Sequence, residues 1–177
     1  MGDGLSFELS EEFVARPFGL LLKLSGATIA DVAVARTAME PVAARHLAES
    51  GNQSAYNELE RMVENDIRAA YESGNLAEVS ARFHRRMVEL SGNATLGMMA
   101  GMLHEIQVRH MAFVFKERRP VSKADYEKVM RSYRRLMEFM RSGDGPAAET
   151  HWRKHLDTTR NLLLKGLETV KVRDVVG

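Results

Sequence analysis

The segment 79–93, VSARFHRRMVELSGN, places two hydrogen-bonding side chains on a helix face that should be apolar. At 100° per residue, charged side chains fill one side of this helix, and Ser80 and His84 fall between Met87 and Val88 on the other. Leaving a buried imidazole without a partner costs about 1–3 kcal/mol. We therefore expect His84 to bind either a neighbouring side chain or a ligand.

Polar side chains interrupt the apolar stripes of three more predicted helices, at Arg36, Tyr133 and His155. A buried guanidinium needs a carboxylate, which either Glu40, four residues along, or an acidic ligand could supply. Because four helices each turn a polar group inward, we hypothesise that these groups surround a cavity, which is a usual place for a small ligand in a bundle. The alternative is a solid core in which protein neighbours satisfy each group.

Arg109 is a second candidate cation for an acidic ligand, because it lies among apolar residues of the predicted helix 95–117. Glu105, four residues earlier, could equally neutralise Arg109 at the surface.

The elements that must position these side chains are all predicted to be helices, because no segment alternates with period two for long enough to form a strand. Gly-containing breakers, among them three copies of Ser-Gly-Asn, separate the helices, and Pro146 stands where a first helical turn tolerates proline. We expect an all-α, antiparallel bundle of six to seven helices. The predicted helices cover residues 10–24, 28–49, 56–72, 79–90, 95–117, 123–141 and 146–170.

Composition excludes several classes of protein. The chain has 177 residues and no cysteine, which suits one domain and rules out disulfides and thiolate zinc sites. Its 25 Lys and Arg against 24 Asp and Glu lack the basic excess of a chain whose main task is gripping nucleic acid. There is no apolar run of about 18 residues and no signal peptide, so we expect no membrane partner and a cytoplasmic location.

Three segments together resemble a known family. ARTAMEPVAARHLAES (35–50), RFHRRMVELSGNATL (82–96) and YRRLMEFMRSGDGPAAETHWRKHL (133–156) are similar, in order and spacing, to the C-terminal effector-sensing (FCD) domain of FadR-type regulators in the GntR family. The resemblance covers about residues 28–164. It implies an antiparallel helical bundle that binds a small metabolite, often an organic acid, and often a divalent metal. It also implies a homodimer whose preceding winged helix-turn-helix domain holds DNA.

The metal set implied by the resemblance is only half kept. The family uses Asp-x-x-x-His on one helix and one His on each of two later helices. His84 and His155 match two of these positions, whereas Ser80 and Tyr133 replace the Asp and the remaining His. A hydroxyl and a neutral phenol are poor ligands for Zn²⁺, Ni²⁺ or Mn²⁺, so we expect no resident cofactor and at most a weak metal site at the two histidines. The predicted ligand-binding residues are Arg36, Ser80, His84, Arg109, Tyr133 and His155.

The resemblance also implies a domain plan. Residues 2–9, GDGLSFEL, are similar to the tip and last strand of a wing. We therefore predict a wing or linker remnant at 1–9, a helical effector-binding domain at 10–172 and a tail at 173–177. Contact with DNA would then need an N-terminal domain that this sequence lacks.

The prediction is a small-molecule sensing and dimerisation domain without catalysis. The first alternative, a metal-dependent helical-bundle enzyme, lacks the Glu-x-x-His, His-Glu-x-x-His, P-loop and Gly-x-Ser-x-Gly signatures. His151-x-x-x-His155 is the one metal-like doublet, and it is unspecific. The second alternative, a stand-alone helical binding protein, would need an exposed apolar stripe, whereas the charged faces here look solvated.

Overall fold

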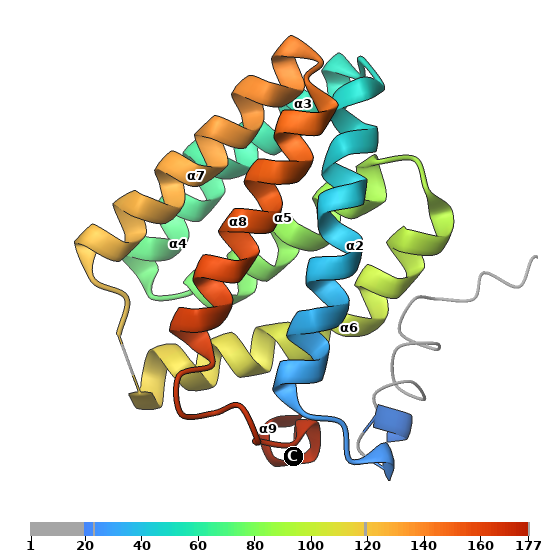
Figure 1. Cartoon of the computed structure of the whole chain (residues 1–177). Coiled ribbons are helices and arrows are strands. Elements are labelled where there is room, and N and C mark those ends of the chain that lie inside the picture. The colour runs from blue at the N-terminus through green and yellow to red at the C-terminus, as the bar shows by residue number, and fades with distance from the viewer. Residues whose placement is uncertain (1–19, 23, 119, 177) are drawn as a thin grey trace, which may run out of the picture.

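The computed structural model describes residues 20–22, 24–118 and 120–176, and their helices form a bundle (Figure 1). The all-α prediction is confirmed, since the described residues contain no strand, only an isolated antiparallel bridge between Thr28 and Lys171. None of the helices in this part of the chain is long and apolar enough to cross a membrane. The elements are α2 (Ile29–Glu49), α3 (Gln53–Arg61), the π-helix η1 (Met62–Ile67), α4 (Arg68–Ser73), α5 (Leu76–Leu90), α6 (Ala94–Phe113), the π-helix η2 (Val114–Arg118), α7 (Lys123–Ser142), α8 (Gly145–Leu163) and α9 (Val172–Val176).

The repeated Ser-Gly-Asn segments end one helix and start the next. Gly51, Gly74 and Gly92 all have positive φ, a conformation that glycine adopts without steric cost and that commonly ends helices. The following asparagines Asn52 and Asn93 then cap the next helix by accepting a hydrogen bond from a backbone N–H at 3.1 Å. Short connections of this kind place consecutive helices next to one another.

Helices α2 and α8 run antiparallel side by side (Figure 1), and a hydrogen bond next to a proline in α2 links them. Pro41 lies inside α2, where it cannot donate the usual hydrogen bond to the carbonyl of Thr37. Arg153 of α8 donates to that carbonyl instead, with its Nη1 3.1 Å from the oxygen. The carbonyl that Pro41 leaves without its usual donor thus takes part in a contact between α2 and α8.

The structure differs from the predicted helices in several places: the helix predicted at 79–90 begins at Leu76, and the one predicted at 95–117 ends in the π-helix η2. The predicted helix 56–72 is a longer run from Gln53 to Ser73 that contains the π-helix η1, in which Met62, Val63 and Ile67 are buried. The predicted helix 146–170 ends at Leu163, and turns that include Gly166 at φ 76° lead to α9, which begins at Val172 and continues into the predicted tail. The predicted helix 10–24 lies mostly outside the described residues.

The bundle core combines aliphatic side chains with a few large rings. Phe83, Tyr133 and Trp152 are fully buried and come from α5, α7 and α8. The rings of Phe83 and Tyr133 stack with centroids 4.5 Å apart, and Trp152 lies 5.6 Å from Tyr133. These rings pack against one another and against His84, which belongs to the polar cluster described next.

Candidate functional site

Five of the six predicted ligand-binding residues line one partly open cavity of about 70 Å³. This volume is enough for several water molecules or a small organic group. Most of its wall is apolar, with Met111, Val129 and Leu163 among the lining residues. The polar residues come from four helices and gather on one part of the wall: Arg36 from α2, Ser80 and His84 from α5, Tyr133 from α7 and His155 from α8.

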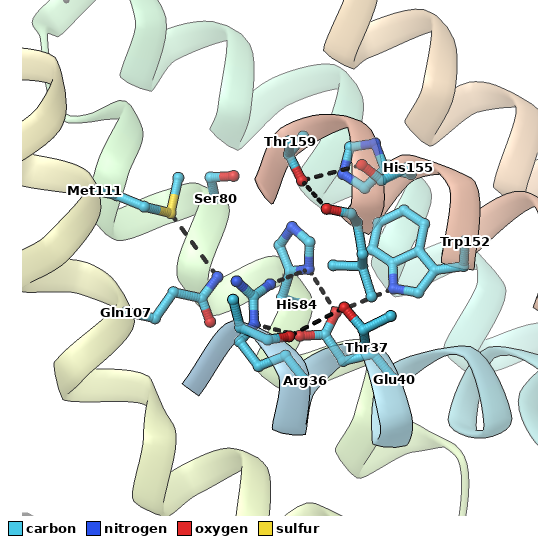
Figure 2. Close-up of polar contacts among 12 residues, drawn as sticks. Arg36, Thr37, Glu40, Ser80, His84, Gln107, Met111, Trp152, His155 and Thr159 are labelled. Atoms are coloured by element: carbon cyan, nitrogen blue, oxygen red, sulfur yellow. Dashed lines mark hydrogen bonds and ion pairs between the residues drawn. The ribbon is translucent and has the colours of Figure 1, made fainter. Parts of the chain in front are cut away.

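Glu40 is the centre of the polar cluster. Its carboxylate accepts hydrogen bonds from Arg36 Nε at 2.6 Å, His84 Nδ1 at 2.7 Å and Trp152 Nε1 at 3.0 Å (Figure 2). The residue is only 2% exposed. Of the two carboxylates considered for Arg36, the protein's own Glu40 therefore supplies the pairing charge.

The charges in this cluster follow from these contacts. Burial alone would raise the pKa of Glu40, but the charge of Arg36 and the hydrogen bonds to the carboxylate outweigh burial and hold the pKa well below its ordinary value. Burial lowers the pKa of His84; the Glu40 carboxylate raises it in part and the Arg36 charge lowers it, so that the pKa stays below its ordinary value. At neutral pH the cluster therefore contains ionised Glu40, charged Arg36 and neutral His84, with no net charge.

Because the Glu40 carboxylate is ionised, it determines which atom donates in each of the neighbouring hydrogen bonds. Arg36 Nη2 lies 2.9 Å from His84 Nδ1, yet one ring nitrogen cannot accept from Arg36 and donate to Glu40 at once. Because Glu40 is ionised, Nδ1 carries the proton and His84 Nε2 is an acceptor. The Tyr133 hydroxyl, 3.1 Å away, therefore donates to Nε2 and accepts from Ser80 Oγ at 2.9 Å. The result is a hydrogen-bonded chain that runs from Ser80 to Glu40.

His155 closes the polar part of the wall. Its ring stacks on Trp152 at 4.5 Å and lies 5.7 Å from the ring of His84. Burial, together with the neighbouring His84, lowers the pKa of His155 well below its ordinary value, so the ring is neutral. None of the described residues forms a hydrogen bond with the ring nitrogens of His155, which leaves one N–H donor and one acceptor for another molecule.

The donor set does not fit the divalent metal that the family often binds. Where that metal would need an aspartate and a histidine, Ser80 and Tyr133 bond to each other. Burial raises the pKa of Tyr133, so its phenol stays neutral and protonated. Within the described part of the chain, no group of three or more His, Cys, Asp or Glu side chains could hold a metal ion. His84 is in addition occupied by Glu40 and Tyr133, so that of the two histidines at the family's metal positions only His155 has free ring nitrogens among the described contacts.

Arg109 is not part of this site. Its Nε donates to Glu105 at 2.6 Å, and its side chain is 47% exposed. The guanidinium therefore meets the surface carboxylate that sequence analysis held open as the alternative, and Arg109 does not line the cavity.

Sequence analysis missed several polar residues of the wall, among them Gln107, Asp125 and Thr159. Gln107 is 7% exposed and belongs to the buried face of α6 together with Leu103 and Ile106, so helical spacing alone could have found it. Thr159 follows His155 by one turn, and its hydroxyl donates to the His155 carbonyl at 3.0 Å.

Comparison with protein families now connects this geometry to a known domain. The FCD domain matches residues 31–158, most of the chain, and all five polar cavity residues that were predicted lie in the matched range. No curated protein and no solved structure matches the chain. FCD domains are the effector-binding domains of GntR-family regulators and are not a known family of enzymes. By this match over most of its length, the chain belongs to the FCD domain family.

Proposed function

We propose that the chain senses a small organic molecule, most readily an organic acid, in the cavity next to Arg36. The observation that carries the proposal is the convergence of buried polar groups from four helices on an open space instead of on a solid core. Family membership supports the same reading, because effector binding is the task of an FCD domain. The domain would act by binding alone, without catalysis.

Three residues of this wall offer hydrogen-bond donors to an oxygen-rich head group, whereas the one carboxylate among the lining residues, Asp125, already accepts from Ser122 Oγ at 2.8 Å. Glu40 already accepts three hydrogen bonds, and no described residue accepts one from Arg36 Nη1. His155 adds a ring N–H, and the amide of Gln107 adds a further N–H. A carboxylate can accept from several of these donors at once. The apolar remainder of the cavity would then surround the carbon skeleton of the effector.

The ligand has to meet Arg36 on the side turned away from Glu40. Arg36 donates through Nε to Glu40, so its other edge remains for the effector. Ser80, His84 and Tyr133 would line the site through the hydrogen-bonded chain. The effector therefore adds an acceptor to Arg36 and leaves the internal ion pair in place.

A regulator is the setting in which such a domain is useful. We propose, from family membership, that the native protein is a GntR-type transcriptional regulator which acts as a homodimer and contacts DNA through a separate domain. DNA binding, dimerisation and a cytoplasmic location stay predictions.

A thermal-shift screen against small organic acids tests the proposal. A ligand at about one hundred times its dissociation constant should add about 2.7 kcal/mol of stability. To locate binding, Val129→Trp fills the cavity, whereas Val34→Trp makes the same change on α2 at an exposed position. We expect the shift to disappear in the first variant and to persist in the second. A shift that survives Val129→Trp would place the ligand elsewhere and refute the proposed site.

A further inference from the structure

A second, smaller cavity adjoins the first. It has a volume of about 30 Å³, room for one or two water-sized groups, and lies between α2, α6 and α8. Five residues line both cavities and form the partition between them: Arg36, Gln107, Met111, Thr159 and Leu163. Arg36 therefore faces two spaces, of which the proposed function uses only the larger.

His110 is an unsatisfied acceptor in the wall of this second cavity. The residue is 8% exposed, and its buried Nε2 has no hydrogen-bond partner among the described residues. The other ring nitrogen donates to the backbone of Leu163. Burial, together with the charge of Arg36, lowers the pKa of His110 to about 4, so the ring is neutral and Nε2 presents a lone pair.

The partition can adjust to a ligand. The Gln107 amide donates to Met111 Sδ at 3.8 Å, and a thioether sulfur is only a weak acceptor. Methionine side chains are also flexible and fill irregular spaces. A group bound at Arg36 therefore has a path from the larger cavity towards His110.

We propose that the second cavity is a polar subsite of the effector pocket, in which His110 Nε2 accepts a hydrogen bond from a hydroxyl group of the effector. This inference rests on the proposed function and narrows its ligand class to hydroxyl-bearing organic acids. A neutral hydroxyl fits better than an ammonium group, because the charge of Arg36 repels a second cation in the same small space. The carboxylate would lie against Arg36 and the hydroxyl would enter beyond it.

Matched ligands test the subsite by isothermal titration calorimetry on the full chain. The probes are 2-hydroxybutanoate and butanoate, which differ by one hydroxyl group. We expect the hydroxy acid to bind about tenfold more tightly, as one satisfied buried acceptor implies. The preference should vanish in His110→Phe and persist in part in His110→Gln, which keeps an acceptor oxygen.

His104→Phe is the matched control, because His104 is on the same helix and also has a buried ring nitrogen without a partner, yet it lines neither cavity. The control should keep the full preference. Equal binding of the two acids by the unmodified chain would mean that an ordered water alone satisfies His110 and would overturn the inference. A preference that survives His110→Phe would overturn it as well.

Two further readouts keep the outcomes separate. Nitrogen NMR of the unmodified chain should show the His110 Nε2 resonance shift with 2-hydroxybutanoate and not with butanoate, which tests the contact even if His110→Phe misfolds. If the thermal-shift screen finds only ligands without a hydroxyl group, the subsite falls while the proposed function stands. If no organic acid binds at the cavity, the proposed function itself fails.

Discussion

Replacing Glu40 with Gln should destabilise the chain more than any other loss of a single charge in this bundle. The substitution keeps the shape of the side chain but leaves Arg36 buried without a counter-charge, and it weakens the hydrogen bonds from His84 and Trp152. Removing one partner of a buried ion pair costs about 3–5 kcal/mol. We expect a decrease of that size in the free energy of unfolding, measured by urea denaturation at neutral pH.

The chain offers a control with the same chemistry at the surface. Glu49 accepts from Arg45 at 2.9 Å with the same four-residue spacing, but both side chains are more than 40% exposed. Glu49→Gln should therefore cost about 0–1 kcal/mol. In the variant that combines Arg36→Met with Glu40→Gln, much of the lost stability should return, because no uncompensated charge remains.

The refuting result is equally clear. If Glu40→Gln costs no more than Glu49→Gln, the carboxylate is not the charge that holds Arg36 in the core. The assignment of protons along the chain from Ser80 would then also fail, because it depends on an ionised Glu40.

Two further predictions concern protons and metal. The pKa of His110 is about 4 in the folded chain and 6.5 ordinarily, so its contribution to stability is complete above pH 6.5 and is lost as the pH falls towards 4. Between about pH 7.5 and 5.5 this residue alone should remove about 1.3 kcal/mol from the free energy of unfolding, and urea titrations of His110→Phe should show a smaller loss over that range. A pH dependence that is unchanged in this variant would contradict the assignment. Ser80→Asp combined with Tyr133→His should create a binding site for a divalent metal, and elemental analysis should then find close to one metal ion per chain. The unmodified chain should contain well below one ion. Stoichiometric metal in the unmodified chain would contradict the argument that Ser80 and Tyr133 are unsuitable metal ligands.

Much of this bundle could be predicted from local sequence chemistry. Ser-Gly-Asn segments end helices through a positive φ at glycine and start the next through an asparagine cap, and both effects act within a few residues. Apolar periodicity placed Arg36, His84, Tyr133 and His155 on inward faces. The resemblance was confirmed by the match to the FCD domain.

The features of the fold and the site that could not be predicted from the sequence depend on contacts between residues far apart in the chain. The central position of Glu40 depends on Trp152, 112 residues away, as much as on its neighbour Arg36. The early end of α8 depends on how residues 164–171 return to pair with Thr28, which no local spacing reveals. The π-helix η1 has no local signature in this sequence. Arg109 was a candidate because its helix reads as apolar, and only tertiary packing shows that its own face is outside.

The direction of the hydrogen-bonded chain limits what the cavity can recognise beside Ser80. Reversing the Tyr133 hydroxyl would require the proton of His84 to move from Nδ1 to Nε2, and a bare Nδ1 would then oppose the carboxylate of Glu40 lone pair to lone pair. Through His84, the Glu40 carboxylate thus fixes the direction of the hydrogen bond that the Tyr133 hydroxyl makes, although Glu40 does not contact Tyr133 in the chain of hydrogen bonds. Because its only proton is committed to Tyr133, Ser80 can offer an incoming molecule nothing but oxygen electron pairs. That end of the cavity should therefore tolerate a donor and reject a bare anion, which would make a bound molecule enter with one orientation.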